Sequence, residues 1–114
     1  MGHRLQKVLR RRREQEGTKI GSFIPVGSDE EIKRERGKAR ELRQSAWWKQ
    51  KLARGVCYYC NAKVPPPELT MDHIVPLIRG GKSTKANLVT ACKSCNNKKK
   101  YLLPIEWEEY LRSL

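Results

Sequence analysis

Cys57-Tyr-Tyr-Cys60 and Cys92-Lys-Ser-Cys95 are the stretches that decide the fold, and 31 residues separate them. Two residues stand between the cysteines of each pair, a spacing with which a tight turn presents two thiolates to one metal ion. Two such pairs form a closed tetrahedral set, so we expect a structural zinc ion that leaves no position for a reacting water. Each pair alone could be a redox centre, but two pairs in one small basic chain favour zinc.

A second set of polar residues lies inside and just after this insert. Asp72-His73-Ile-Val-Pro76 comes first, Asn87 follows 14 positions after His73, and Asn96 follows nine positions after Asn87. This pattern resembles the signature of the HNH, or ββα-metal, endonucleases over about residues 55–101, including the zinc knuckles of one subgroup. The resemblance implies an α+β fold: a small ββα-metal unit with a four-cysteine zinc knuckle and flanking helices.

The residue types fit the hydrolysis of a phosphodiester. That reaction needs a water-derived nucleophile, neutralised charge at phosphorus and help for the leaving alkoxide. We expect His73 to be the general base, because histidine titrates near neutral pH. Carboxylate and amide oxygens suit a hard cation, so Asp72 and Asn96 are the expected ligands of a catalytic Mg²⁺ or Mn²⁺. Since successive strand residues point to opposite faces, Asp72 and His73 can share one phosphate only if the strand ends or twists there.

The resemblance also implies roles for the asparagines and for DNA. It implies that Asn87 bonds backbone across the loop and fixes the presentation of the histidine, although an ordinary turn asparagine is the alternative. Many relatives have histidine where Asn96 stands, and Asn97 is a second candidate ligand. Basic residues near these positions are expected to contact the DNA backbone, with a solvated surface as the alternative for each: Arg79, Lys82, Lys98, Lys99 and Lys100.

Composition supports a polyanionic partner. The chain has 114 residues and a formal net charge of +13, and residues 1–54 hold 16 Lys and Arg against 7 acidic residues. Neutralised phosphates release counterions, so this excess favours nucleic acid, while the basic stretches lack the apolar face of a membrane-surface helix. No run is apolar enough for a membrane span or a signal peptide, and we expect a cytoplasmic protein.

The sequence divides into three expected parts. Residues 1–27 are an arginine-rich arm and loop, which is either solvated or binds phosphate groups. Residues 28–55 form a basic helix that begins with a capping box at Ser28 and ends near Gly55, with Trp47 and Trp48 packing rather than stacking on bases. Residues 56–114 form the nuclease core, with strands over residues 69–75 and 87–91, an exposed helix from Cys92, and a last helix from Pro104.

The prediction is therefore a DNA endonuclease, for which a homodimer would allow double-strand cleavage. A noncatalytic zinc module that binds nucleic acid is the second candidate, and a thiol redox protein the third. The sequence does not choose among duplex, branched or damaged DNA as substrate.

Overall fold

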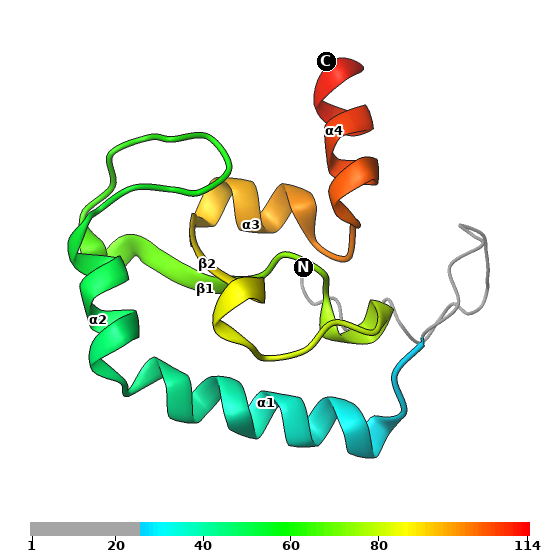
Figure 1. Cartoon of the computed structure of the whole chain (residues 1–114). Coiled ribbons are helices and arrows are strands. Elements are labelled where there is room, and N and C mark those ends of the chain that lie inside the picture. Colours follow the sequence, from blue (N-terminus) through cyan, green and yellow to red (C-terminus); the bar gives the residue numbers. More distant parts are fainter. Residues whose placement is uncertain (1–25) are drawn as a thin grey trace.

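The structure is a computed structural model in which residues 26–114 are described. The predicted arginine-rich arm lies almost entirely outside the described residues. Figure 1 shows a short hairpin at the centre of the molecule, with one helix above it and a long helix running beneath it. Among the described residues, no helix has the length and apolar character needed to cross a membrane.

The long helix, α1 (Asp29–Arg43), begins where the capping box predicts. Ser28 accepts from the backbone N–H of Glu31 at 3.1 Å, and the Glu31 carboxylate accepts from the Ser28 N–H at 2.9 Å. The single helix predicted to reach Gly55 is wrong, because a second helix, α2 (Ala46–Ala53), starts after a break. Ser45 makes that break: its hydroxyl donates to the Leu42 carbonyl and accepts from the Trp48 N–H.

The hairpin consists of β1 (Leu69–His73) and β2 (Leu88–Cys92), paired antiparallel from Leu69 opposite Cys92 to His73 opposite Leu88. The helix α3 (Lys93–Lys99) follows β2 without a loop and packs against both strands. Two strands and a helix in this order, with a cysteine cluster beside them, are the predicted ββα-metal arrangement. Both strands differ from the predicted ranges at their ends, because β1 stops before Ile74 and β2 continues to Cys92.

The remaining segments connect these elements. A 3₁₀ turn, Pro66–Glu68, leads into β1, and such a turn tolerates proline in its first positions. Two more 3₁₀ turns, Leu77–Arg79 and Lys85–Asn87, lie in the loop between the strands. The last helix, α4 (Pro104–Arg112), begins at the predicted proline and buries Trp107.

The core is small and lies around the hairpin. Leu88 and Ala91 are fully buried on β2, and Trp48 from α2 and Ala39 from α1 are 2% exposed. Trp48 is thus a core residue, as predicted, while Trp47 is half-buried with the ammonium groups of Lys51 and Lys85 near its ring. The helices outside the hairpin therefore hold its strands in place.

Candidate metal centre and active site

The four cysteines come together at one end of the hairpin. Their sulfur atoms all lie within 4.8 Å of one another, and the Sγ atoms of Cys60 and Cys92 are 4.0 Å apart. Tetrahedral zinc with bonds of about 2.3 Å separates its sulfur ligands by roughly 3.8 Å, so this cluster fits a metal ion such as zinc. Burial opposes ionisation of Cys57, but backbone donors at Cys92 and Cys60 outweigh it and lower its pKa to about 7.

His73 is the last residue of β1, at the opposite end of the hairpin. Its Nε2 lies 2.9 Å from the hydroxyl oxygen of Ser83. Burial lowers the pKa of the imidazole below its usual 6.5, and the nearby charge of Asp72 only partly opposes this shift. The ring is therefore predominantly neutral near pH 7, as a proton acceptor must be.

Asp72 is held by two side chains. One carboxylate oxygen, Oδ2, accepts from the Tyr59 hydroxyl at 2.5 Å and pairs with the Lys99 ammonium at 3.3 Å. Burial raises the pKa of Tyr59 and the hydrogen bond to Asp72 raises it further, so the phenol stays protonated and donates. No such contact occupies the other oxygen, Oδ1, among the described residues.

Asp72 and His73 leave β1 on opposite faces, because regular pairing with β2 continues through His73. Asp72 shares its face with Thr70, which contacts α3, whereas His73 shares its face with Met71, which receives a hydrogen bond from Arg43 of α1. Of the two expected alternatives, an end or a twist of the strand, the structure shows the end, directly after His73. A phosphate that meets both side chains would have to lie across this strand end.

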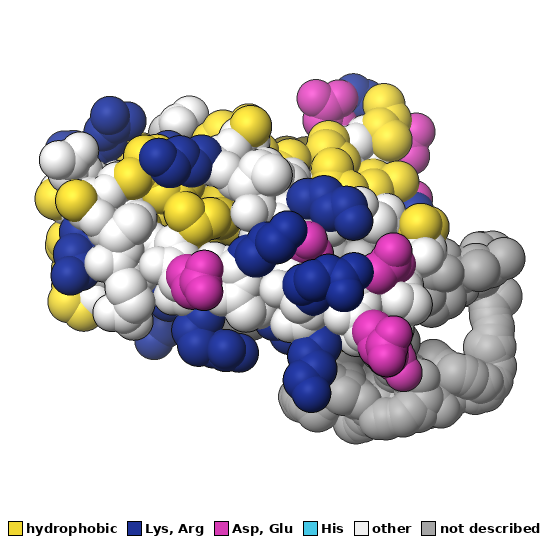
Figure 2. All heavy atoms as spheres, turned by 60° about the horizontal axis from the view of Figure 1, so that its bottom comes forward, with side chains coloured by type: hydrophobic (Ala, Val, Ile, Leu, Met, Phe, Trp, Pro, Cys, Tyr) yellow, Lys and Arg dark blue, Asp and Glu magenta, His cyan; other side chains and the backbone are white. Residues whose placement is uncertain are grey.

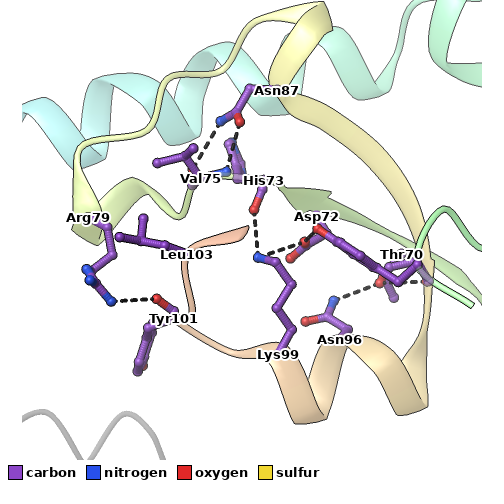
Figure 3. Close-up of polar contacts among 12 residues, drawn as sticks. Thr70, Asp72, His73, Val75, Arg79, Asn87, Asn96, Lys99, Tyr101 and Leu103 are labelled. Carbon is purple, nitrogen blue, oxygen red and sulfur yellow. Dashed lines mark hydrogen bonds and ion pairs between the residues drawn. The ribbon is translucent and has the colours of Figure 1, made fainter. Parts of the chain in front are cut away.

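Asn87 bonds to backbone on both sides of the loop between the strands. Its Oδ1 accepts from the Val75 N–H at 2.9 Å, while its Nδ2 donates to the carbonyls of Val75 and Lys82 at 3.0 and 2.8 Å. The Asn87 carbonyl also accepts from the Ile74 N–H. These bonds fix the chain immediately after His73, and Figure 3 shows those between Asn87 and Val75.

Asn96 lies on α3 beneath the strand, on the same face as Asp72. Its Nδ2 donates to the Thr70 hydroxyl at 2.8 Å, and Thr70 in turn donates to the Ala91 carbonyl. The amide is thereby oriented, and among residues 26–114 no hydrogen-bond donor occupies its carbonyl oxygen (Figure 3). Asn96 and Asp72 thus each offer one oxygen, the donor type that a hard divalent cation prefers.

Lys99 is not on the surface with its neighbours Lys98 and Lys100, which corrects the expected exposure of this lysine run. The Lys99 side chain is 1% exposed, and its ammonium donates to the His73 carbonyl at 3.1 Å besides pairing with Asp72. Figure 3 shows it inserted between these two groups. Its charge is therefore committed to the site, and it is not placed to meet an external phosphate.

Arg79 was also expected to contact the DNA backbone, but its guanidinium is bonded within the protein. Its guanidinium makes two 3.0 Å hydrogen bonds to the carboxylate of Glu106 and a third to the Tyr101 carbonyl. These bonds attach the loop between the strands to the start of α4, and the guanidinium lowers the pKa of Glu106. Lys82, Lys98 and Lys100 remain exposed.

Basic residues also cover the outer face of α1. Figure 2 shows Lys and Arg side chains spread over this face, with acidic side chains among them. The exposed cations of the helix are Lys33, Arg34, Arg36, Lys38, Arg40 and Arg43.

Sequence reasoning missed Tyr59, Thr70 and Ser83, which contact predicted site residues, and Glu35, which contacts Ser83. Tyr59 lies between two cysteines in the sequence, and its hydroxyl reaches from the knuckle to Asp72 on the adjacent strand. Ser83 and Glu35 are each 5% exposed and are separated by 48 positions in the chain. No local pattern connects them, because their contact depends on how α1 packs against the loop.

Comparison with known families agrees with this arrangement. Residues 57–101 match the family model described as HNH endonuclease. The match runs from the first cysteine to just beyond the end of α3, and the clustered cysteines fit a zinc-binding subgroup of that family. The helices α1, α2 and α4 lie outside the matched residues. No curated protein matches the chain.

Proposed function

We propose that this chain is a metal-dependent endonuclease that hydrolyses DNA phosphodiester bonds with His73 as general base. The observation that carries the proposal is the position of His73 within an HNH-matched segment: a half-buried imidazole with a lowered pKa at the end of a braced strand. In the reaction, a ring nitrogen of His73 takes the proton of the attacking water, and the products carry 5′-phosphate and 3′-hydroxyl ends.

Asp72 and Asn96 would hold the catalytic ion, Mg²⁺ or Mn²⁺, each through the oxygen that protein contacts leave available. Such an ion neutralises charge on the scissile phosphate and assists the leaving oxygen. Tyr59 and Thr70 orient these two ligands through the hydrogen bonds described above. The cysteine cluster would hold zinc as a structural ion, at the end of the hairpin opposite His73.

DNA binding would use the exposed cations at the two edges of the site: Lys82, Lys98 and Lys100. Each lysine that neutralises a phosphate steepens the dependence of affinity on salt. The basic outer face of α1 would extend this contact along the duplex.

A second candidate is a noncatalytic zinc module that binds nucleic acid. One observation favours it: the Lys99 ammonium already neutralises the Asp72 carboxylate, which reduces its attraction for a divalent cation. Such a module would need the cysteines and exposed lysines but neither His73 nor Asp72.

The deciding experiment is cleavage of labelled duplex, branched and damaged DNA in Mg²⁺, Mn²⁺ or Zn²⁺, with His73→Ala and Thr84→Ala proteins alongside. Thr84 is an exposed neighbour of the site whose side chain makes no capping hydrogen bond, so its variant controls for handling and folding. We expect the wild type and Thr84→Ala to cut and His73→Ala to bind without cutting. Binding without cleavage by all three proteins would favour the noncatalytic module.

A further inference from the structure

Glu35 of α1 accepts two hydrogen bonds from Ser83. Its carboxylate Oε1 accepts from the Ser83 N–H at 2.7 Å, and its backbone carbonyl accepts from the Ser83 hydroxyl at 2.5 Å. The same hydroxyl oxygen lies 2.9 Å from His73 Nε2. A chain of hydrogen bonds therefore runs from a helix outside the HNH-matched residues to the imidazole ring.

The direction of each hydrogen bond in this chain is fixed. A carbonyl oxygen can only accept, so the single hydroxyl proton of Ser83 must lie between Ser83 Oγ and the Glu35 carbonyl. Ser83 Oγ can then only accept from His73, and the proton in that contact must be on Nε2. A neutral His73 with a proton on Nε2 has its lone pair on Nδ1.

We propose that Ser83 and Glu35 are positioning residues that hold His73 in the Nε2–H form and present Nδ1 as the atom that accepts the proton of water. The catalytic part of this inference rests on the proposed endonuclease function, whereas the tautomer does not. Neither residue touches the substrate, and both act through the orientation of the ring.

Burial and compensating hydrogen bonds hold Ser83 and Glu35 in this arrangement. Ser83 and Glu35 are both buried, and burying a carboxylate is costly unless hydrogen bonds compensate for the lost water. The Ser83 N–H, together with the Lys38 ammonium at 3.2 Å, provides that compensation and lowers the pKa of Glu35. Gly81 lets the preceding loop come close, since a Cβ there would lie 1.8 Å from the Val75 carbonyl oxygen.

The tautomer can be read directly in the wild-type protein loaded with zinc. Two-bond ¹H–¹⁵N spectra of ¹⁵N-histidine protein, recorded at a pH where the ring is neutral, distinguish a protonated Nε2 from a protonated Nδ1. We expect His73 to show the Nε2–H form with a proton protected from exchange. A predominantly Nδ1–H ring would overturn the inference, whether or not the protein cuts DNA.

Substitutions test the catalytic part. Ser83→Ala should speed exchange of the Nε2 proton and lower kcat by roughly 10- to 100-fold with little change in KM, because a misplaced base slows chemistry but leaves DNA binding intact. Ser83→Thr keeps the hydroxyl and should recover most of the rate. Glu35→Ala removes the carboxylate that accepts from the Ser83 N–H but keeps the backbone carbonyl that accepts from its hydroxyl, so it should lower kcat in the same way but by less. Thr84→Ala and Glu41→Ala, exposed matches on the same loop and helix, should behave as wild type.

Failure of the positioning role and failure of the endonuclease function would give different results. If the wild type cuts DNA and Ser83→Ala cuts equally fast, Ser83 does not position the base, although the endonuclease assignment stands. If no protein cuts DNA but the ring is Nε2–H and loses its protected proton in Ser83→Ala, the positioning chain stands and the endonuclease assignment fails. A melting curve for each variant separates loss of the fold from loss of ring orientation.

Discussion

The two ends of the β1–β2 hairpin are assembled in different ways. At the end where Leu69 pairs with Cys92, two short sequence motifs supply all four sulfur atoms of the cluster. At the end where His73 pairs with Leu88, the contacts come from α1, α3 and the loop between the strands. The first end is a local construction that a metal ion can complete, whereas the second depends on the packing of the whole chain.

The two ends should therefore lose their structure in different ways. Loss of one cysteine removes a quarter of a tetrahedral shell, so the metal end should fail as a unit. The histidine end is held by separate contacts through Ser83, Asn87 and Lys99, so it should fail in steps.

Removing the metal should unfold the domain. Zinc contributes about 10–16 kcal/mol to the folding of small zinc-dependent units, which equals or exceeds the whole unfolding free energy of an ordinary domain. We expect one zinc per chain by elemental analysis, and loss of cooperative melting by circular dichroism after chelation or in Cys57→Ser. Ser94→Ala, an exposed change between two of the cysteines, should melt normally. A stable fold in the metal-free protein would refute the structural role of the cluster.

Replacing the proposed base should abolish cleavage while leaving the fold intact. General base catalysis typically contributes a factor of about 10²–10⁴, so His73→Gln should lose that much in single-turnover cleavage with a similar melting temperature. Gel-shift affinity for the same DNA should be unchanged. Retention of full cleavage would remove His73 from the mechanism.

Replacing the buried lysine should destabilise the histidine end. Lys99→Met leaves the Asp72 carboxylate, whose side chain is only 12% exposed, without its cation. Breaking a buried ion pair from one side costs about 3–5 kcal/mol, which urea denaturation can measure. Adding Asp72→Asn should recover part of the loss, and Lys98→Met on the exposed side of α3 should have little effect. An equal, small loss of stability in Lys99→Met and Lys98→Met would contradict the burial of Lys99.

Two glycine substitutions should change the stability of the fold in opposite directions. Gly81→Ala places a Cβ 1.8 Å from a backbone oxygen, so the loop must shift at a cost of about 1–3 kcal/mol. Gly37→Ala, in the middle of α1 with no atom within 4 Å of the added Cβ, should stabilise the protein by about 1 kcal/mol. Thermal melts of both variants measure this contrast, and destabilisation by Gly37→Ala would show that α1 is packed more tightly there.

The smallest expected effect is on pH dependence. Because burial lowers the pKa of His73 in the folded chain, the unfolded chain binds that proton more tightly. The group therefore contributes stability above its unfolded pKa of about 6.5, and this contribution is lost as the pH falls through the lowered folded value. The stability difference between wild type and His73→Gln, measured across that range, should shrink in acid. Cleavage should likewise persist to a pH below 6.5, and a midpoint above it would contradict the shift.

Much of the fold followed from local patterns. The capping box placed the start of α1, the cysteine spacing predicted the cluster, and Pro104 marked the start of α4. The break at Ser45 was missed because the apolar spacing runs on across it, while the hydroxyl of that one residue caps both neighbouring ends. Exposure within the lysine run was also misjudged at Lys99, since composition does not reveal which of three adjacent cations meets a buried carboxylate.

The sequence alone determined the HNH pattern, the basic character of the chain and the set of thiols, because these depend on residue type and short spacing. Only the tertiary structure decided that Asp72 faces Lys99 and Tyr59, and that His73 faces Ser83 and Glu35. The physical reason is that such contacts join residues up to 48 positions apart. Their geometry follows from how helices pack on the two faces of a strand, which no local pattern encodes.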